Sequence, residues 1–259
     1  MNQSMFINKA RSILSDNAGI RRLPNQRSGK FLDESRLGLV KAGHTRVFQK
    51  PVRRQFYDYH ICIAIDCSGS MAGEKMRSAS WATHATARAL EISGAHISVI
   101  AFARLVVEIP KAIWSNPSKM LEFCAKFMEI RLENERGEYL NTNGGGNHDW
   151  EAIIKSTNLL LEKSSPGKIM LVMSDGLPSC GFGQKYCSSY CLEGNKGMDK
   201  MMHQVIADAR NKGITVLAIG IYQDTSIKYY GARQTRVINS VNQLYSEMAS
   251  ILEKNIVRG

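Results

Sequence analysis

The sequence predicts an α/β domain: a three-layer, doubly wound and mostly parallel sheet with helices on both faces. Short runs are apolar at every position, as strands covered on both faces must be, and segments of helical period separate them. The 259 residues, 44% of them hydrophobic, can bury one sizeable core but are few for two domains. We therefore expect one organised domain over residues 31–259, preceded by a basic N-terminal arm over residues 1–30.

The arm contains short apolar clusters interrupted by Gly19, Pro24 and Gly29, which predicts loose packing with one helix near residues 4–14. The net charge is +11, from 34 basic and 23 acidic residues, and much of the excess precedes the first buried strand. A basic arm can bind an acidic protein face or nucleic acid. A solvated charged surface is equally consistent, because aromatic residues are not interleaved as base stacking would require.

The first buried strand is expected over residues 60–65, and it ends abruptly at Asp66. An amphipathic helix follows over residues 74–92, in which Met76, Ala79 and Thr83 recur at three- and four-residue steps. Further strands are expected over residues 96–102, 105–109, 168–173, 214–221 and 235–238. The strand over 105–109 is expected to form a hairpin edge with the strand before it. Further helices are expected over residues 117–128, 150–161, 198–211 and 241–256.

Polar side chains gather where the predicted strands end, and in a glycine-rich loop before one helix. In an open α/β sheet, ligands bind at the carboxyl ends of the strands. The candidate ligands all carry oxygen, which Mg²⁺ and Mn²⁺ prefer. They are Asp66, Ser68, Ser70, Asn147, Asp149 and Asp175.

The alternative is structural: the two serines cap the following helix and Asp66 completes the turn. The apolar strand before Asp66 and the Asp175-Gly176 pair after a later strand favour the metal site. Because few carboxylates would bind the cation directly, an Asp or Glu of a partner protein is a natural last ligand.

A second candidate site combines Cys180, Cys187 and Cys191 with His203, which could bind Zn²⁺ tetrahedrally. The spacing departs from the usual Cys-x-x-Cys, and three unpaired loop thiols are the alternative. The other histidines are scattered and expected at the surface or in packing. Irregular cysteine spacing, with Cys62 and Cys67 in or beside a buried strand, predicts reduced thiols and a cytoplasmic protein.

Several classes of function are disfavoured by what the sequence lacks. There is no Gly-x-x-x-x-Gly-Lys-Ser/Thr string for ATP hydrolysis, and Ser68 lacks the Gly-x-Ser-x-Gly context of a hydrolase nucleophile. We therefore do not expect an enzyme. No run of about 18 apolar residues and no signal peptide is found, so no membrane association is expected.

The segments Asp66-Cys67-Ser68-Gly69-Ser70-Met71 and Met173-Ser174-Asp175-Gly176 resemble the metal-ion-dependent adhesion site of von Willebrand A domains, which have a Rossmann-like fold. Over residues 29–256 the chain resembles more closely the C-terminal domain of the T subunit of aerobic, ATP-dependent cobaltochelatase. The matching blocks are Gly29-Lys30-Phe31-Leu32-Asp33, Arg46-Val47-Phe48, Asn147-His148-Asp149-Trp150-Glu151-Ala152-Ile153, Ser174-Asp175-Gly176-Leu177-Pro178 and Leu217-Ala218-Ile219-Gly220-Ile221, followed by Tyr229-Tyr230.

This resemblance implies a non-catalytic subunit that works with an AAA+ ATPase ring and with a large subunit that binds the corrin precursor. Asn147 occupies the position where most A domains carry threonine, and its side-chain oxygen could coordinate equally well. The N-terminal domain and acidic linker of the full T subunit have no counterpart here. We therefore expect a stand-alone reduced form, of a kind also carried by some bacteriophages, in which case the location is the host cytoplasm.

Three functions follow from these observations. The leading hypothesis is an adaptor for a MoxR-type or chelatase-type AAA+ ATPase that binds a client's acidic side chain through the cation. The second is a basic nucleic-acid-binding or virion-associated protein that uses the A domain as a scaffold. The third is a true chelatase subunit that helps to insert cobalt into a tetrapyrrole.

Overall fold

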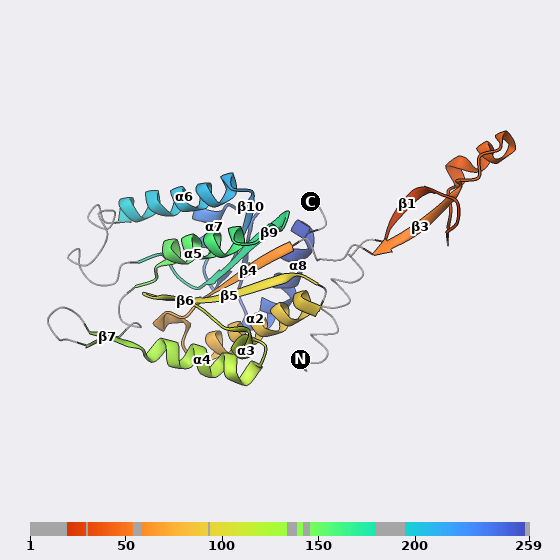
Figure 1. Cartoon of the computed structure of the whole chain (residues 1–259). Helices are drawn as coiled ribbons and strands as arrows, with labels where there is room; N and C mark the ends of the chain where they lie inside the picture. Colours follow the sequence, from red (N-terminus) through yellow and green to blue (C-terminus); the bar gives the residue numbers. More distant parts are fainter. Residues whose placement is uncertain are drawn as a thin grey trace.

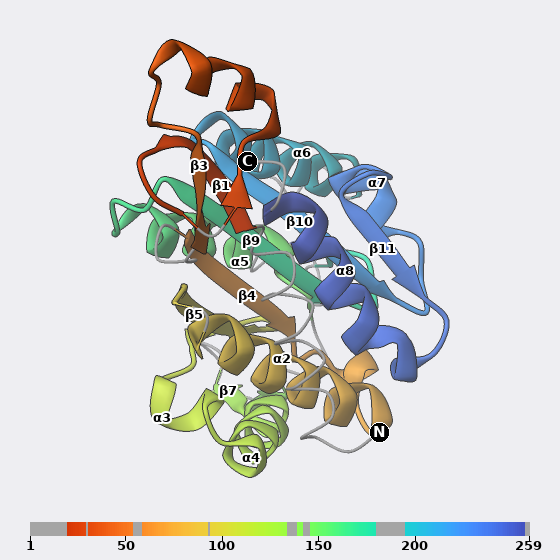
Figure 2. The ribbon, with the colours of Figure 1, turned by 90° about the vertical axis from the view of Figure 1, so that its right-hand side faces the viewer.

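The structure is a computed structural model of the chain, and it describes residues 20–29, 31–53, 59–92, 94–133, 139–141, 146–179 and 195–256. Most of these residues surround a six-stranded sheet, called here the main sheet (Figures 1 and 2). Its strands are β4 (Tyr59–Asp66), β5 (His96–Phe102), β6 (Val106–Glu108), β9 (Gly167–Ser174), β10 (Ile214–Ile221) and β11 (Thr235–Ile238).

The strand order of the main sheet is β11-β10-β9-β4-β5-β6. All neighbours are parallel except β6, which runs antiparallel to β5 and confirms the predicted hairpin edge. The chain winds outward from β4 in one direction and from β9 in the other. The order therefore reverses between β4 and β9, which are neighbours, and the carboxyl ends of these strands form the switch point where doubly wound sheets bind ligands.

Helices cover both faces of the main sheet, as expected. One face packs against α2 (Glu74–Ile92), α4 (Pro117–Glu129) and α8 (Leu244–Ile256), with the short α3 (Lys111–Trp114) beside them. The other packs against α5 (Asp149–Leu161), α6 (Asn195–Asn211) and α7 (Ser226–Tyr230). Along β4, Ile61, Ile63 and Ile65 enter the first core whereas Cys62 and Ala64 enter the second. This alternation explains why residues 61–65 of the strand are all apolar.

The predicted helix boundaries agree with the structure to within a few residues. The helix expected from residue 117 begins there because the Asn116 side chain accepts hydrogen bonds from the amides of Ser118 and Lys119, at 3.0 and 3.1 Å. Helix α6 begins three residues before its predicted start, and the closing helix begins as a 3₁₀ turn, Val241–Gln243. Elements of five residues or fewer that were not predicted include α3, α7 and the antiparallel pair of β7 (Arg131–Glu133) and β8 (Tyr139–Asn141).

A second, small sheet lies before β4 and projects away from the main sheet (Figure 1). It contains β1 (Ile20–Gln26), β2 (Phe31–Leu32) and β3 (Phe48–Arg53) in the antiparallel order β1-β3-β2, with a 3₁₀ segment over Glu34–Ala42. The domain boundary predicted at residue 30 falls between β1 and β2 and stays a prediction. The helix expected near residues 4–14 lies outside the described residues.

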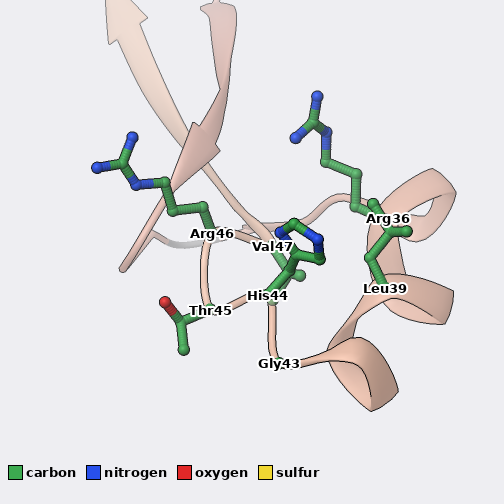
Figure 3. Close-up of a pocket in the computed structure, with 7 residues that line it drawn as sticks. All are labelled: Arg36, Leu39, Gly43, His44, Thr45, Arg46 and Val47. Carbon is green, nitrogen blue, oxygen red and sulfur yellow. The ribbon is translucent and has the colours of Figure 1, made fainter.

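A pocket lies beside this small sheet (Figure 3). Arg36, His44 and Arg46 contribute to its lining, and Arg36 also forms an ion pair with Asp33 at 3.7 Å. The pocket is therefore basic in character. Within the described part of the chain, no helix is long and apolar enough to cross a membrane.

Candidate metal centre

The loop after β4 folds back over the end of its own strand. Asp66 is fully buried, and its Oδ1 accepts a hydrogen bond of 2.7 Å from the amide of Ser68. The amide of Cys67 donates to the carbonyl of Phe102 on β5 at 2.7 Å, and the Met71 side chain is fully buried. These anchors fix the loop against the main sheet, so that the Asp66 carboxylate lies inside the protein.

The second oxygen of Asp66 is held by two elements distant in sequence. Its Oδ2 accepts hydrogen bonds from Ser174 Oγ at 2.7 Å and from Asn147 Nδ2 at 2.9 Å. Asn147 Nδ2 also donates to Ser174 Oγ at 3.2 Å. Ser174 was not among the predicted site residues. Its polarity directly after the apolar run over residues 169–173, next to Asp175, was the signal that could have identified it.

The two serines of the loop lie on the Asp175 side of the cluster. Ser70 Oγ donates to Asp175 Oδ1 at 2.6 Å, and the Ser68 and Ser70 hydroxyl oxygens are 3.1 Å apart. The other oxygen of Asp175 accepts a hydrogen bond from Lys75 Nζ at 2.5 Å. Lys75, in the first turn of α2, is the second contributor that sequence analysis missed.

The loop before α5 completes the arrangement. The backbone of Asn147 exchanges two hydrogen bonds with Ser179, and the amide of His148 donates to the Ala103 carbonyl. These bonds place Asn147 and Asp149 at the cluster, both buried. Asn147 Oδ1 and Asp149 Oδ1 are buried without a hydrogen-bond partner among the described residues. Burying a polar oxygen without a hydrogen bond destabilises the fold, and a cation bound to these two oxygens would remove that penalty.

The carboxylates of this cluster are electrostatically strained. Burial raises the pKa of Asp66 from 3.8 to about 6, although hydrogen bonds from Ser174 and Ser68 oppose the rise. Burial also raises the pKa of Asp149 well above its usual range, and the charges of Asp66 and Asp175 raise it further. A positive charge among these groups would therefore favour their ionised forms.

The structure thus brings together all six residues predicted as metal ligands. Hydroxyl, amide and carboxylate oxygens are the donors that Mg²⁺ and Mn²⁺ accept, so the residues fit such a cation. Among the residues described, no three His, Cys, Asp or Glu side chains converge into a metal-binding group by themselves. The expectation that few carboxylates bind the cation directly stays a prediction.

The predicted zinc site stays untested because Cys180, Cys187 and Cys191 lie outside the described residues. Its fourth residue, His203, is exposed on α6, with its ring centroid 5.6 Å from that of Tyr229. Cys62, Cys67 and Cys124 are free and buried. Two of the remaining histidines pack inside the domain: His60 bonds Ser98 Oγ at 3.0 Å, and His84 bonds the Trp114 carbonyl at 2.9 Å.

Two solved structures of pilus proteins have a similar fold. The pilus adhesin SpaC from Lactobacillus rhamnosus GG is 13% identical with a TM-score of 0.50, over 77% of this chain and 30% of that one. A D319A mutant of the PilB minor pilin from Streptococcus sanguinis is 13% identical with a TM-score of 0.52, and the match covers 82% of this chain and 64% of that one. This chain therefore spans less than two thirds of either protein, and the likeness concerns the fold alone. Comparison with curated protein sequences gave no significant match.

The doubly wound sheet with an Asp-x-Ser-x-Ser loop at its switch point defines a von Willebrand A-type domain. Residues 47–257 match the family model described as the cobalamin biosynthesis protein CobT VWA domain. The chain belongs to this family, as the resemblance to the cobaltochelatase T subunit predicted.

Proposed function

We propose that this protein is a metal-dependent protein-binding subunit of an ATP-dependent complex. It works in the cytoplasm with an AAA+ ATPase ring of the MoxR or chelatase type and is not itself the catalyst. The observation that carries the proposal is the cluster at the switch point, where buried Asn147 Oδ1 and Asp149 Oδ1 have no partner among the described residues. Membership in the CobT family supports the partnership with such a complex.

Ser68, Ser70 and Asn147 would hold Mg²⁺ or Mn²⁺, with Asp66, Asp149 and Asp175 balancing its charge directly or through water. Such a cation would supply a ligand position for an outside carboxylate. Ser70 is exposed, whereas Asp66, Asp149 and Asp175 are buried, so the approach lies on the Ser70 side. A client protein would bind there through an Asp or Glu side chain. In a chelatase complex, the same contact would hold the subunit that binds the tetrapyrrole.

The alternative function is nucleic-acid binding with the A domain as a scaffold. The net charge of +11 and the pocket lined by Arg36, His44 and Arg46 favour it. This binding would weaken steeply with salt because it releases counterions. Replacing Asp66 should leave nucleic-acid binding unchanged but should abolish metal-dependent partner binding, and this difference separates the two functions.

The test is co-purification with candidate AAA+ ATPases of the MoxR or chelatase type, first in magnesium and then in EDTA. We expect the complex to form in magnesium, to dissociate in EDTA, and to be lost in Asp66→Ala. The matched control is Asp208→Ala, which removes an exposed carboxylate near the end of α6. This helix leads into the amino end of β10, so Asp208 lies at the edge of the main sheet opposite the carboxyl ends of the strands. A folded Asp66→Ala variant that lost the metal and still bound its partner with full affinity would refute the adaptor mechanism.

A further inference from the structure

The ammonium group of Lys75 supplies a positive charge at the cluster of candidate metal ligands. Its ammonium lies 2.5 Å from Asp175 Oδ2 and 3.2 Å from the carbonyl oxygen of Ser70. It also lies 5.5 Å from the centre of the Tyr222 ring, a distance at which the ring face attracts a cation. Three groups from three segments therefore hold one ammonium at the residues proposed to bind the metal.

The position of Lys75 in its helix makes this arrangement specific. A lysine in the first turn of a helix faces the positive end of the helix dipole, which disfavours its charge there. Its partner carboxylate compensates, because the Asp175 side chain is completely buried and would otherwise lack a counter-charge. The Lys75 side chain remains 30% exposed, so it has a path away from the site.

Tyr222 is held in an unusual conformation beside this lysine. It follows β10 directly and has φ of 61°, the one positive φ found at a non-glycine residue of the described chain. Its amide donates to the carbonyl of Ile238 at 2.8 Å, which fixes the turn. A bulky residue at positive φ is costly, and here it places an aromatic face under the ammonium.

We propose that Lys75 is a tethered competitor of the divalent cation, and that its contacts with Asp175, Ser70 and Tyr222 set the metal affinity of the site. This inference rests on the proposed function, since it assumes that Ser70 and Asp175 contribute to metal binding. The ammonium and the divalent cation both need the Asp175 carboxylate, and their like charges repel each other at this distance. Metal binding therefore requires Lys75 to leave Asp175 for solvent, and the energy of its three contacts is subtracted from the binding energy.

Titration with Mn²⁺ alone, by calorimetry or by the electron paramagnetic resonance of free Mn²⁺, tests the proposal. Lys75→Met should bind Mn²⁺ about tenfold more tightly, because a partly buried ion pair no longer has to be broken. Lys75→Arg, which retains the charge, should stay within about threefold of the wild type. Tyr222→Asn, which tolerates positive φ and changes no charge, should tighten binding by about two- to fivefold.

The control is Lys126→Met, which removes an ammonium from the exposed pair with Glu122 on α4 and should leave Mn²⁺ affinity unchanged. If Lys75→Met does not fold, Lys75→Gln removes the charge while keeping a hydrogen-bond donor for Asp175, with the same expectation.

A second readout separates competition from a purely structural role. In EDTA, Lys75→Met should unfold at a lower temperature than the wild type because the buried Asp175 has lost its partner. Excess Mn²⁺ should raise the unfolding temperature of the variant by more than that of the wild type. A structural role would lower stability under both conditions and would not tighten binding.

The outcomes are distinguishable. If the wild type binds Mn²⁺ and Lys75→Met binds it equally or more weakly, competition by Lys75 is refuted while the proposed function stands. If neither wild type nor any Lys75 variant binds Mn²⁺, both the metal site and the competition are refuted.

Discussion

Replacing Asp66 by asparagine should stabilise the metal-free protein near neutral pH. Folding moves the pKa of Asp66 from 3.8 to about 6, chiefly because the carboxyl group is buried. That difference corresponds to about 3 kcal/mol of destabilisation once the group is ionised in both states. Asparagine avoids the charge and still accepts from the Ser68 amide, but Asn147 Nδ2 loses a carboxylate acceptor, at a cost of about 1 kcal/mol. The net expectation is a gain of about 2 kcal/mol.

The sign of the pH dependence follows from the same values. The pKa of Asp66 is higher in the folded than in the unfolded protein. The stability that its protonated carboxyl group contributes is therefore complete below about pH 4 and is lost as the pH rises through about 6. The advantage of Asp66→Asn should therefore be largest above about pH 6 and should shrink towards pH 4.

Magnesium should remove most or all of the stability advantage of Asp66→Asn. At a hundredfold excess over its dissociation constant, a cation adds about 3 kcal/mol to the wild type. The variant should bind it ten- to a hundredfold more weakly, as is typical when a partner that orients the ligands is lost. Urea unfolding followed by circular dichroism, in EDTA and in excess magnesium, measures both effects, with Asp208→Asn as the control. A variant less stable than the wild type in EDTA, or equally stabilised by magnesium, would refute the reasoning.

Three further predictions concern other parts of the chain. Burial lowers the pKa of His60 from 6.5 to about 4, so the stability that it contributes is present above pH 6.5 and falls by about 2 kcal/mol at pH 5. Between pH 7 and 5, the free energy of unfolding of His60→Gln in urea titrations should thus fall by about 2 kcal/mol less than that of the wild type. An equal fall in both proteins would contradict this assignment. A shortened chain beginning at residue 31 should remain soluble and melt within a few degrees of the full chain in calorimetry, because the main sheet contains none of the removed strand; insolubility would make the arm part of the core. If Cys180, Cys187, Cys191 and His203 bind zinc, protein purified without chelator should carry about one equivalent by elemental analysis, and Cys187→Ser should lose it; finding none in the wild type would refute the predicted zinc site.

The sequence by itself determined the layers of this protein and the chemistry of its candidate site. Strand β4 was identified because a strand covered on both faces must be apolar at every position, and this property is visible in consecutive residues. The same local pattern marked Asp66 and Asp175 as polar residues at strand ends, and hence as candidates for one site. The family resemblance was likewise carried by short blocks, and the match over residues 47–257 confirmed it.

Only the tertiary structure decided how these residues meet. Placing β4 beside β9 brings Ser174 within 2.7 Å of Asp66 across 108 positions of sequence, and no local pattern encodes that pairing. The reach of Lys75 to Asp175 likewise depends on where α2 begins relative to the end of β9. Periodicity reports which face of an element is buried, whereas a hydrogen bond or an ion pair forms only where the packed backbones bring two side chains within about 3 Å.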